Sequence, residues 1–291
     1  SNILNKGIIT GAAIKIGNDT YPVDPSDISY TNNSDIDLSA GENSQVLVDT
    51  GFTLTNNGAL TNIGGFENHG TITTTNNGGT LSIVSGTNGN YGTITQSSMN
   101  ISAQFTNRQN GSITAEVTNS VGANFTNEEN ASVTGSVINK ATFANNGTVN
   151  GAISNEVGGA FTNTGVIGLE SSKVNITNSG TFNANSGTLN VDKITNNAGI
   201  FTNKVASTFG TIDNKNGATY NNDAATTVTT LTNAGKINNN YSLNVTNSFN
   251  NTSNGEISGR NGTLDIRNGG TNDGTISQKD VKIAGDFANN N

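Results

Sequence analysis

A short phrase recurs along this chain: an aromatic residue, one spacer residue and an Asn, followed by a turn that contains Gly. Successive aromatic positions are separated by 20, 18, 18, 21, 19 and 19 residues, and they are Phe105, Phe125, Phe143, Phe161, Phe182, Phe201 and Tyr220. A period that tolerates small insertions is the signature of a solenoid. In such a fold each repeat buries its apolar face only against its neighbours.

An aliphatic version of the phrase lies between the aromatic ones, as in Ile176-Thr177-Asn178 and Ile194-Thr195-Asn196. The half-period is therefore about ten residues, which suits a strand of 3–5 residues and a turn but is too short for a helical repeat. Val, Ile, Thr and Phe, which favour strands, occupy the alternating positions. The sequence predicts an all-β parallel β-helix (β-solenoid) with about 18–21 residues per coil.

The phrase also predicts the interior of the coil. The aromatic and aliphatic residues are expected to point inward and stack on their counterparts in the next coil. The Asn two residues later then also points inward, where its amide must be paired. Coils spaced by about 4.8 Å allow equivalent Asn side chains to hydrogen-bond as a ladder. The glycines that follow are expected to supply positive φ in the turns; they are Gly111, Gly147, Gly165, Gly235 and Gly255.

Composition limits the class of protein. The chain has 291 residues, of which 31% are hydrophobic and 12% charged, with 2 Pro and no Cys. Disordered chains are usually rich in charge and Pro and lack β-branched periodicity, so disorder is disfavoured. The absence of Cys fits a chain exported across a periplasm. No stretch of 18 apolar residues and no signal peptide is visible.

The repeat predicts one continuous β-helical domain over residues 1–291. Its ends, Ile3-Leu4-Asn5 and Phe287-Ala288-Asn289, read as parts of repeats without caps, which predicts a segment of a longer protein. Residues 17–50 contain both prolines and are expected to form a loop or hairpin excursion. Residues 54–291 are expected to form the regular coils, with a less regular stretch at 76–103.

Charge argues against two classes of partner. Residues 1–107 contain 2 basic and 8 acidic residues, and the whole chain has a formal net charge of −8. Nucleic-acid binding needs a basic footprint, and anionic membrane surfaces attract basic segments. We therefore expect neither nucleic acid nor membrane insertion.

The acidic stretch offers the first candidate site. Asp24, Asp27, Asp35 and Asp37 are the densest carboxylates and are candidate Ca²⁺ ligands or an acid/base pair, with a solvated acidic loop as the simpler interpretation. The single His, His69, cannot form a His-based metal site and is predicted to be a solvated turn residue. We expect no catalytic residues, no cofactor and no enzymatic activity.

Two further patterns concern surfaces. Lys173, Lys193 and Lys215 follow one another by 20 and 22 residues, so they are expected to align as a weak basic stripe that binds an acidic partner, including residues 17–50 of another copy. Thr71-Ile72-Thr73 and Thr93-Ile94-Thr95 match the Thr-x-Thr ranks of ice-binding solenoids, but most coils do not.

The Phe-Thr-Asn-x-Gly-x-Ile phrases resemble the passenger domains of type V secretion (autotransporters) in Gram-negative bacteria. They are most similar to AIDA-type self-associating adhesins and filamentous-haemagglutinin-like exoproteins. The resemblance covers about 250 of the 291 residues but is a repeat pattern, not a unique motif. It implies a right-handed parallel β-helix, exported to the cell surface and anchored in the outer membrane through a C-terminal β-barrel outside this segment.

The function predicted from this resemblance is adhesion. The segment is expected to attach cells to each other by self-association, or to a host surface protein or glycan, through its faces and loops. Two alternatives stay open: a polysaccharide-binding or -cleaving β-helix similar to phage tailspikes and lyases, and a passive stalk of a toxin passenger. An acidic groove would favour the first alternative, and featureless polar faces would favour adhesion or the stalk.

Overall fold

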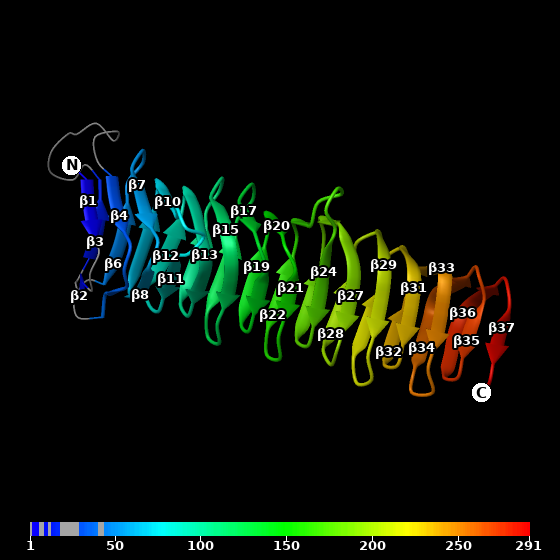
Figure 1. Ribbon diagram of the computed structural model, residues 1–291. Helices are drawn as coiled ribbons and strands as arrows, with labels where there is room; N and C mark the ends of the chain where they lie inside the picture. The colour runs from blue at the N-terminus through cyan, green and yellow to red at the C-terminus, as the bar shows by residue number, and fades with distance from the viewer. Residues whose placement is uncertain (1, 6–8, 11–12, 18–28, 40–43) are drawn as a thin grey trace. The chain divides into compact units, whose positions relative to one another are not determined.

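The computed structural model describes residues 2–5, 9–10, 13–17, 29–39 and 44–291. In this part of the chain the regular structure consists entirely of strands, and no helix could span a lipid bilayer. The chain divides into two compact units, Ser1–Val149 and Asn150–Asn291, which are described separately. Each unit is a right-handed parallel β-helix, as predicted. Figure 1 shows the strands of successive coils stacked beside one another.

Unit 1 has three parallel sheets, each built from one strand per coil. The first sheet contains β1 (Asn2–Asn5), β4 (Ser29–Asn32), β7 (Thr53–Asn56), β10 (Thr71–Thr73), the starts of β13 (Thr93–Ile101) and β15 (Ser112–Asn119), and β17 (Ser132–Thr134). The second contains β2 (Ile9–Thr10), β5 (Ile36–Asp37), β8 (Ala59–Ile63), β11 (Thr80–Ile83), the ends of β13 and β15, and β18 (Val137–Asn139). The third contains β3 (Ala13–Ile16), β6 (Gln45–Val48), β9 (Gly65–Asn68), β12 (Thr87–Asn90), β14 (Gln104–Asn107), β16 (Asn124–Asn127) and β19 (Thr142–Asn145).

Unit 2 follows β20 (Thr148–Asn150), which crosses the boundary in the sequence. One sheet contains β21 (Ile153–Asn155), β24 (Val174–Asn178), the ends of β27 (Val191–Asn196), β29 (Ser207–Asn214), β31 (Thr226–Asn233) and β33 (Ser242–Asn251), then β35 (Gly270–Asn272) and β37 (Phe287–Asn289). A second contains β22 (Ala160–Asn163), β25 (Thr181–Ala184), β28 (Ile200–Asn203), β30 (Thr219–Asn222), β32 (Lys236–Asn239) and the starts of β34 (Glu256–Ile266) and β36 (Thr275–Ile283). On the third side β23 (Val166–Ile167) pairs with β26 (Thr188–Leu189). Farther along, the starts of β29, β31 and β33 pair in succession, the start of β33 pairs with the end of β34, and the end of β34 pairs with the end of β36.

Alternation along each strand separates the core from the surface. In β15, Ile113, Ala115, Val117 and Asn119 are buried, whereas the residues between them face outward. A strand places successive side chains on opposite faces, so apolar residues at every second position fill the interior. The aromatic residues stack in this interior, with ring centroids 4.5 Å apart for Phe125–Phe143 in unit 1. The equivalent distance is 4.7 Å for Phe182–Phe201 in unit 2.

The predicted Asn ladders are confirmed in both units. In unit 1 the Nδ2 of Asn107 donates to Oδ1 of Asn127 at 2.8 Å, and Asn127 donates in the same way to Asn145. In unit 2 one ladder runs without interruption through Asn155, Asn178, Asn196, Asn214, Asn233, Asn251, Asn272 and Asn289. Each amide also donates to backbone carbonyl groups near the corner, so the ladders satisfy polar groups that would otherwise be buried without partners.

The predicted role of the turn glycines is wrong. Gly111, Gly147, Gly165, Gly235 and Gly255 are not among the residues with positive φ. A Cβ at Gly147 would lie 2.2 Å from the carbonyl oxygen of Ala131, and a Cβ at Gly235 would lie 2.3 Å from that of Lys215. Glycine is needed at these two positions because the preceding coil passes too close for any side chain.

The predicted excursion at residues 17–50 is also wrong for its described part; Asp24 and Asp27 lie outside the described residues. β4, β5 and β6 form a coil whose strands pair in register with those of the next coil. Within it, Tyr30-Thr31-Asn32 is a copy of the recurring phrase, and the Asn32 Nδ2 donates to Asn56 Oδ1 at 2.8 Å. The acidic residues around this phrase led to the prediction of an irregular loop, although the strands here form a regular coil.

Candidate functional site

The carboxylates of Asp35 and Asp37 face outward on either side of the buried Ile36, so alternation places them on one face as expected. Each accepts hydrogen bonds: Asp35 Oδ1 from the Ala59 N–H at 3.0 Å, and Asp37 Oδ1 from Asn62 Nδ2 at 2.7 Å and the Ser39 N–H at 2.9 Å. These hydrogen bonds, led by that of Asn62, lower the pKa of Asp37 below its ordinary value of 3.8. In the described residues no three His, Asp or Glu side chains are placed to share a metal ion. The two carboxylates thus cap neighbouring backbone and amide groups of the coil.

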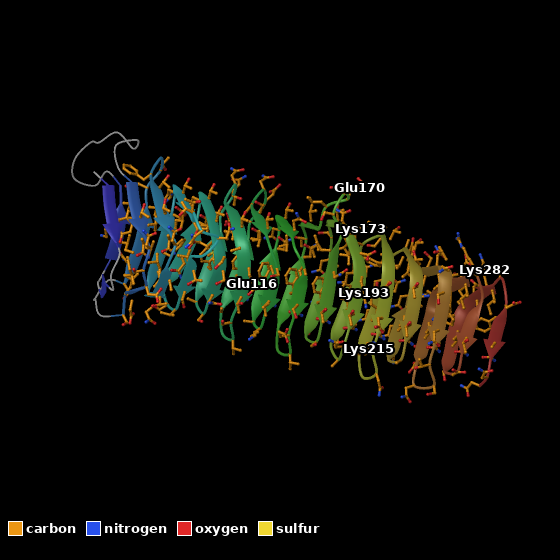
Figure 2. All side chains as sticks on the ribbon, viewed as in Figure 1. Glu116, Glu170, Lys173, Lys193, Lys215 and Lys282 are labelled. Carbon is orange, nitrogen blue, oxygen red and sulfur yellow. The ribbon has the colours of Figure 1, made fainter. Side chains whose placement is uncertain are left out.

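The three lysines do not form the expected stripe, because a spacing of about one coil in the sequence does not place residues at the same position across the strands. Lys193 lies beside Asn175 and Thr211 in the neighbouring strands, whereas Lys215 follows β29 and Lys173 precedes β24. Figure 2 shows the three at different heights across the strands. The Lys215 Nζ pairs with Asp213 Oδ2 at 2.7 Å. Asn175, Lys193 and Thr211 are aligned at steps of 18 residues, so lysines spaced by 20 and 22 residues fall in different columns.

His69 is a turn residue, as predicted, but it is not simply solvated. Its ring stacks on Tyr91, with centroids 4.3 Å apart, and its Nε2 contacts Glu67 Oε1. Arg108 lies 5.7 Å from the Tyr91 ring centroid and pairs with Glu128 Oε1 at 3.2 Å. The four side chains that follow the Asn ladder, His69, Tyr91, Arg108 and Glu128, therefore come from consecutive coils. The sequence separates them by 17–22 residues, so only the coil register shows that they are neighbours.

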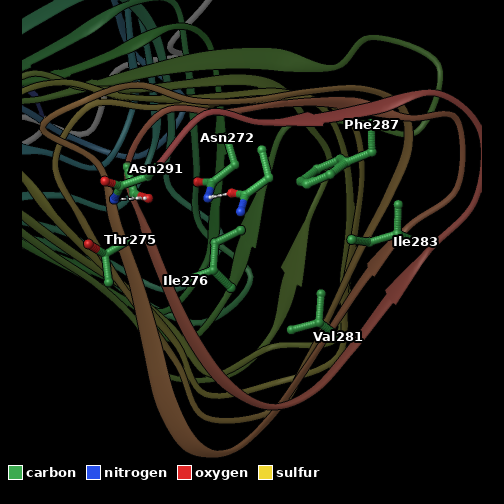
Figure 3. A pocket seen from close by; sticks show the side chains of 9 residues that line it. Asn272, Thr275, Ile276, Val281, Ile283, Phe287 and Asn291 are labelled. Atoms are coloured by element: carbon green, nitrogen blue, oxygen red, sulfur yellow. Dashed lines mark hydrogen bonds between the residues drawn. The ribbon is translucent and has the colours of Figure 1, made fainter.

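A hollow of about 480 Å³ lies at the end of unit 2, lined by apolar residues of β36 and β37. Figure 3 shows Ile276, Val281, Ile283 and Phe287 turned toward it, beside the hydrogen bond from Asn272 Nδ2 to Asn289 Oδ1. These are the same inward positions that earlier coils bury. The hollow is therefore the end of the apolar column, and no titratable side chain lines it.

One ordered polar surface of unit 2 is the outer side of the sheet that begins at β21. One outward residue per coil forms a rank in strand register, which we call the polar face of unit 2: Ser154, Thr177, Thr195, Asp213, Thr232, Asn250 and Thr271. Its one carboxylate, Asp213, is paired with Lys215. Such a surface offers repeated weak hydrogen-bonding groups and no catalytic arrangement.

Comparison with known proteins gives little beyond the architecture. No protein-family model matches the chain, and no curated protein matches it. One solved structure that is similar is the crystal structure of the TibC-catalyzed hyper-glycosylated TibA55-350 fragment, with 15% sequence identity and a TM-score of 0.43. The alignment covers 99% of this chain and 100% of that fragment. At this level the likeness assigns neither family nor function.

Proposed function

We propose that this chain is a segment of a bacterial surface adhesin that attaches through the outer faces of its β-helical coils, with a binding role and no catalytic one. The observation that carries the proposal is the polar face of unit 2, a rank of Ser, Thr and Asn side chains held in register by parallel strands. The repeat phrases that resemble autotransporter passengers support export to the cell surface and anchoring there through a part outside this segment.

The proposed mechanism is summation of weak contacts. A single exposed hydroxyl or amide contributes little to affinity, but an ordered rank lets many such groups engage a second ordered surface together. A second copy of the chain presents an equally ordered rank, so self-association is the partner we propose first. A host surface protein or glycan is the second candidate partner.

A basic side chain, that of Lys193, adjoins this face. Lys193 lies two residues before Thr195 in β27 and faces outward with it, and its pairing partners in the neighbouring strands, Asn175 and Thr211, are uncharged. Because the chain carries a net charge of −8, a basic group on this face favours contact with the acidic surface of another copy. Lys193→Glu should then weaken self-association, most clearly at low salt.

Sedimentation velocity from micromolar to near-millimolar concentration, at low and high salt, tests the proposal. Reversible, concentration-dependent dimers support it, and their loss in high salt assigns part of the contact to charge. A chain that stays monomeric throughout removes self-association. In that case, beads coated with the protein that also fail to bind cell surfaces would remove adhesion itself.

A further inference from the structure

The first sheet of unit 1 carries a second ordered surface, different in chemistry from the polar face of unit 2. Strands β7, β10, β13, β15 and β17 each present two outward residues separated by one buried residue. All of these outward residues are Thr or Ser, and we call them the threonine face: Thr53, Thr55, Thr71, Thr73, Thr93, Thr95, Ser112, Thr114, Ser132 and Thr134. Thr71-Ile72-Thr73 and Thr93-Ile94-Thr95 are thus flanked by Thr53-Leu54-Thr55 in the preceding coil and by Ser-x-Thr segments in the two coils that follow.

Strand register aligns these residues into two straight ranks. Thr53 lies beside Thr71, Thr71 beside Thr93, and Ser112 continues the rank on the far side of Thr93. In the second rank Thr55 lies beside Thr73, and Thr95, Thr114 and Thr134 lie side by side; the pairing of β10 with β13 ends at Ile72 and Ile94, one residue before Thr73 and Thr95. Parallel strands lie about 4.8 Å apart, and alternate residues of a strand lie about 6.7 Å apart. The face is therefore a two-dimensional lattice of hydroxyl groups.

The hydroxyls of this face are available and are held rigidly. In the described structure none of its eight Thr hydroxyls makes a hydrogen bond, and the two Ser side chains bond only to each other, at 3.4 Å. Beneath them Leu54, Ile72, Ile94, Ile113 and Val133 are fully buried. Thr is β-branched and strongly restricted at χ1, so each hydroxyl and methyl keeps its position without a further loss of entropy on binding.

None of the ten residues of the face is charged; the nearest carboxylate on these strands is that of Glu116, two residues beyond Thr114 on β15. The segment after β10 bonds to the corner of the preceding coil, where the Thr75 N–H donates to Asn57 Oδ1 at 2.8 Å and Asn57 Nδ2 donates to Thr75 Oγ1 at 2.9 Å. Complementary charge gives protein partners much of their specificity, and the ten residues of this face offer none. An uncharged lattice with a constant repeat in two directions instead complements a surface that is itself a lattice.

We propose that the threonine face of unit 1 binds ice. Its two repeats are close to those of the oxygen positions on a prism plane of hexagonal ice. Each Thr supplies a hydroxyl that holds one lattice water and a methyl group that excludes disordered water beside it. The proposal uses unit 1 alone and does not depend on the adhesive role proposed for the polar face of unit 2.

The test is inhibition of ice recrystallisation by the whole chain, together with partition of the chain into a slowly growing ice hemisphere. Thr93→Tyr places a ring in the middle of the lattice, and Thr95→Lys places a charge in the second rank. Both changes are outward and leave the core intact. The matched control is Thr126→Tyr, on the outer side of β16 in the third sheet of the same unit. Circular dichroism and thermal melting establish that each variant is folded.

We expect the unaltered chain to enter the ice, and Thr93→Tyr and Thr95→Lys each to require about tenfold more protein for the same inhibition, while Thr126→Tyr behaves as the unaltered chain. An unaltered chain that is excluded from ice overturns the proposal, as does a folded Thr93→Tyr variant with full activity. If Thr93→Tyr instead abolishes self-association without any effect on ice, the face belongs to a second copy of the chain and the ice proposal is wrong.

Discussion

Asn56 and Gln96 hydrogen-bond across an entire coil. The Asn56 Nδ2 donates to Gln96 Oε1 at 2.7 Å, and Gln96 Nε2 donates back to the Asn56 carbonyl at 3.2 Å and to that of Thr73 at 3.0 Å. The coil between them has Thr74 where the ladder needs Asn. In unit 2, Asn239 Nδ2 donates in the same way to Gln278 Oε1 at 2.7 Å, past Gly259. The extra methylene of Gln lets the ladder cross a coil that lacks the amide.

Gln96→Asn should therefore destabilise the protein, although it restores the commonest residue of the ladder. The shorter side chain cannot reach Asn56, so the Asn56 amide keeps only its bonds to the Gly58 and Thr80 carbonyls, and the Asn56 carbonyl loses the Gln96 donor. Loss of hydrogen bonds by buried polar groups costs about 1–3 kcal/mol. Urea unfolding measures the loss. Gln104→Asn is the control, because Gln104 lies outward on β14 and should change stability by less than about 0.5 kcal/mol. Equal effects of the two substitutions would contradict the bridging role.

Removal of one rung in the uninterrupted ladder of unit 2 gives a second prediction. Asn196 accepts from Asn178 and donates to Asn214 at 2.9 Å, and it is completely buried. Asn196→Ala removes the donor to Asn214 Oδ1 and one of the acceptors of Asn178 Nδ2, and should cost about 1–3 kcal/mol of unfolding free energy. The neighbouring, exposed Asn197→Ala should cost less than about 0.5 kcal/mol. Similar urea midpoints for the two variants would show that the ladder contributes little.

The interior was predictable from sequence for a physical reason. Burial favours the same residue type at the same place in successive coils. The recurrence of Phe125, Asn127 and their counterparts therefore predicts both the period and the Asn ladder. Departures from the pattern were not predictable. In β12, Asn88 stands at the position that Phe occupies in other coils, beside Phe105. The ring centroids of Phe66 and Phe105 are 5.9 Å apart. Only the strand register shows that Asn88 belongs to this position.

The surfaces were less predictable because turn lengths vary. Lys193 and Lys215 are 22 residues apart, whereas the coil between them advances by 18, so Lys193 lies beside Thr211 and Lys215 falls in another column. The threonine face could not be predicted from the sequence because its members look like ordinary strand residues when each strand is read alone. Ser112-Ile113-Thr114 and Ser132-Val133-Thr134 are ordinary strand segments until the register places them beside Thr93-Ile94-Thr95.

Tyr220 continues the column of Phe rings in unit 2 and lies 5.5 Å from Phe201, ring centroid to ring centroid. Its side chain is completely buried, and burial raises the pKa of its hydroxyl far above the ordinary value of 10.0, with Thr226 and Asn203 offsetting part of the rise. The hydroxyl has no well-formed hydrogen bond. Tyr220→Phe should therefore leave stability at pH 7 unchanged or raise it by up to about 1 kcal/mol.

The same substitution should change the response to alkaline pH. Because the pKa of Tyr220 is higher in the folded than in the unfolded chain, stability is unaffected below pH 10 and falls as pH rises above that value, where only the unfolded state ionises. Tyr220→Phe removes this loss, so urea midpoints of the variant and the unaltered chain should diverge above pH 10. Parallel curves would contradict the assigned pKa direction.

Asp37 provides a test at the acidic end. The hydrogen bond from Asn62 is the main cause of its lowered pKa, so Asn62→Ala should raise the pKa of Asp37 toward 3.8. A group with a lowered folded-state pKa contributes stability above its unfolded value, and this is lost as pH falls through the folded value, here in the window below pH 4. Carboxyl ¹³C titration of Asp37 by NMR, in the unaltered chain and in the variant, measures the shift. An unchanged Asp37 titration would assign the shift to the Ser39 N–H instead.

The polar face of unit 2 gives the sharpest test of adhesion. Thr177 lies in its rank between Ser154 and Thr195, so Thr177→Arg inserts a long charged side chain among short polar groups, whose one carboxylate, that of Asp213, is already paired with Lys215. Such a charge must lose water without gaining a partner, and we expect dimerisation to weaken by about tenfold or more. The control is Thr162→Arg, which makes the same change on the outer side of β22.

Sedimentation velocity of both variants separates a face-specific effect from a general effect of charge. If Thr162→Arg dimerises as the unaltered chain does and Thr177→Arg does not, the face is the contact surface. If both variants weaken equally and high salt restores both, the added charge acts at long range and the contact lies elsewhere. Unchanged dimerisation of Thr177→Arg would exclude the polar face of unit 2, because an interface cannot accommodate an unpaired guanidinium in its centre without a measurable loss of affinity.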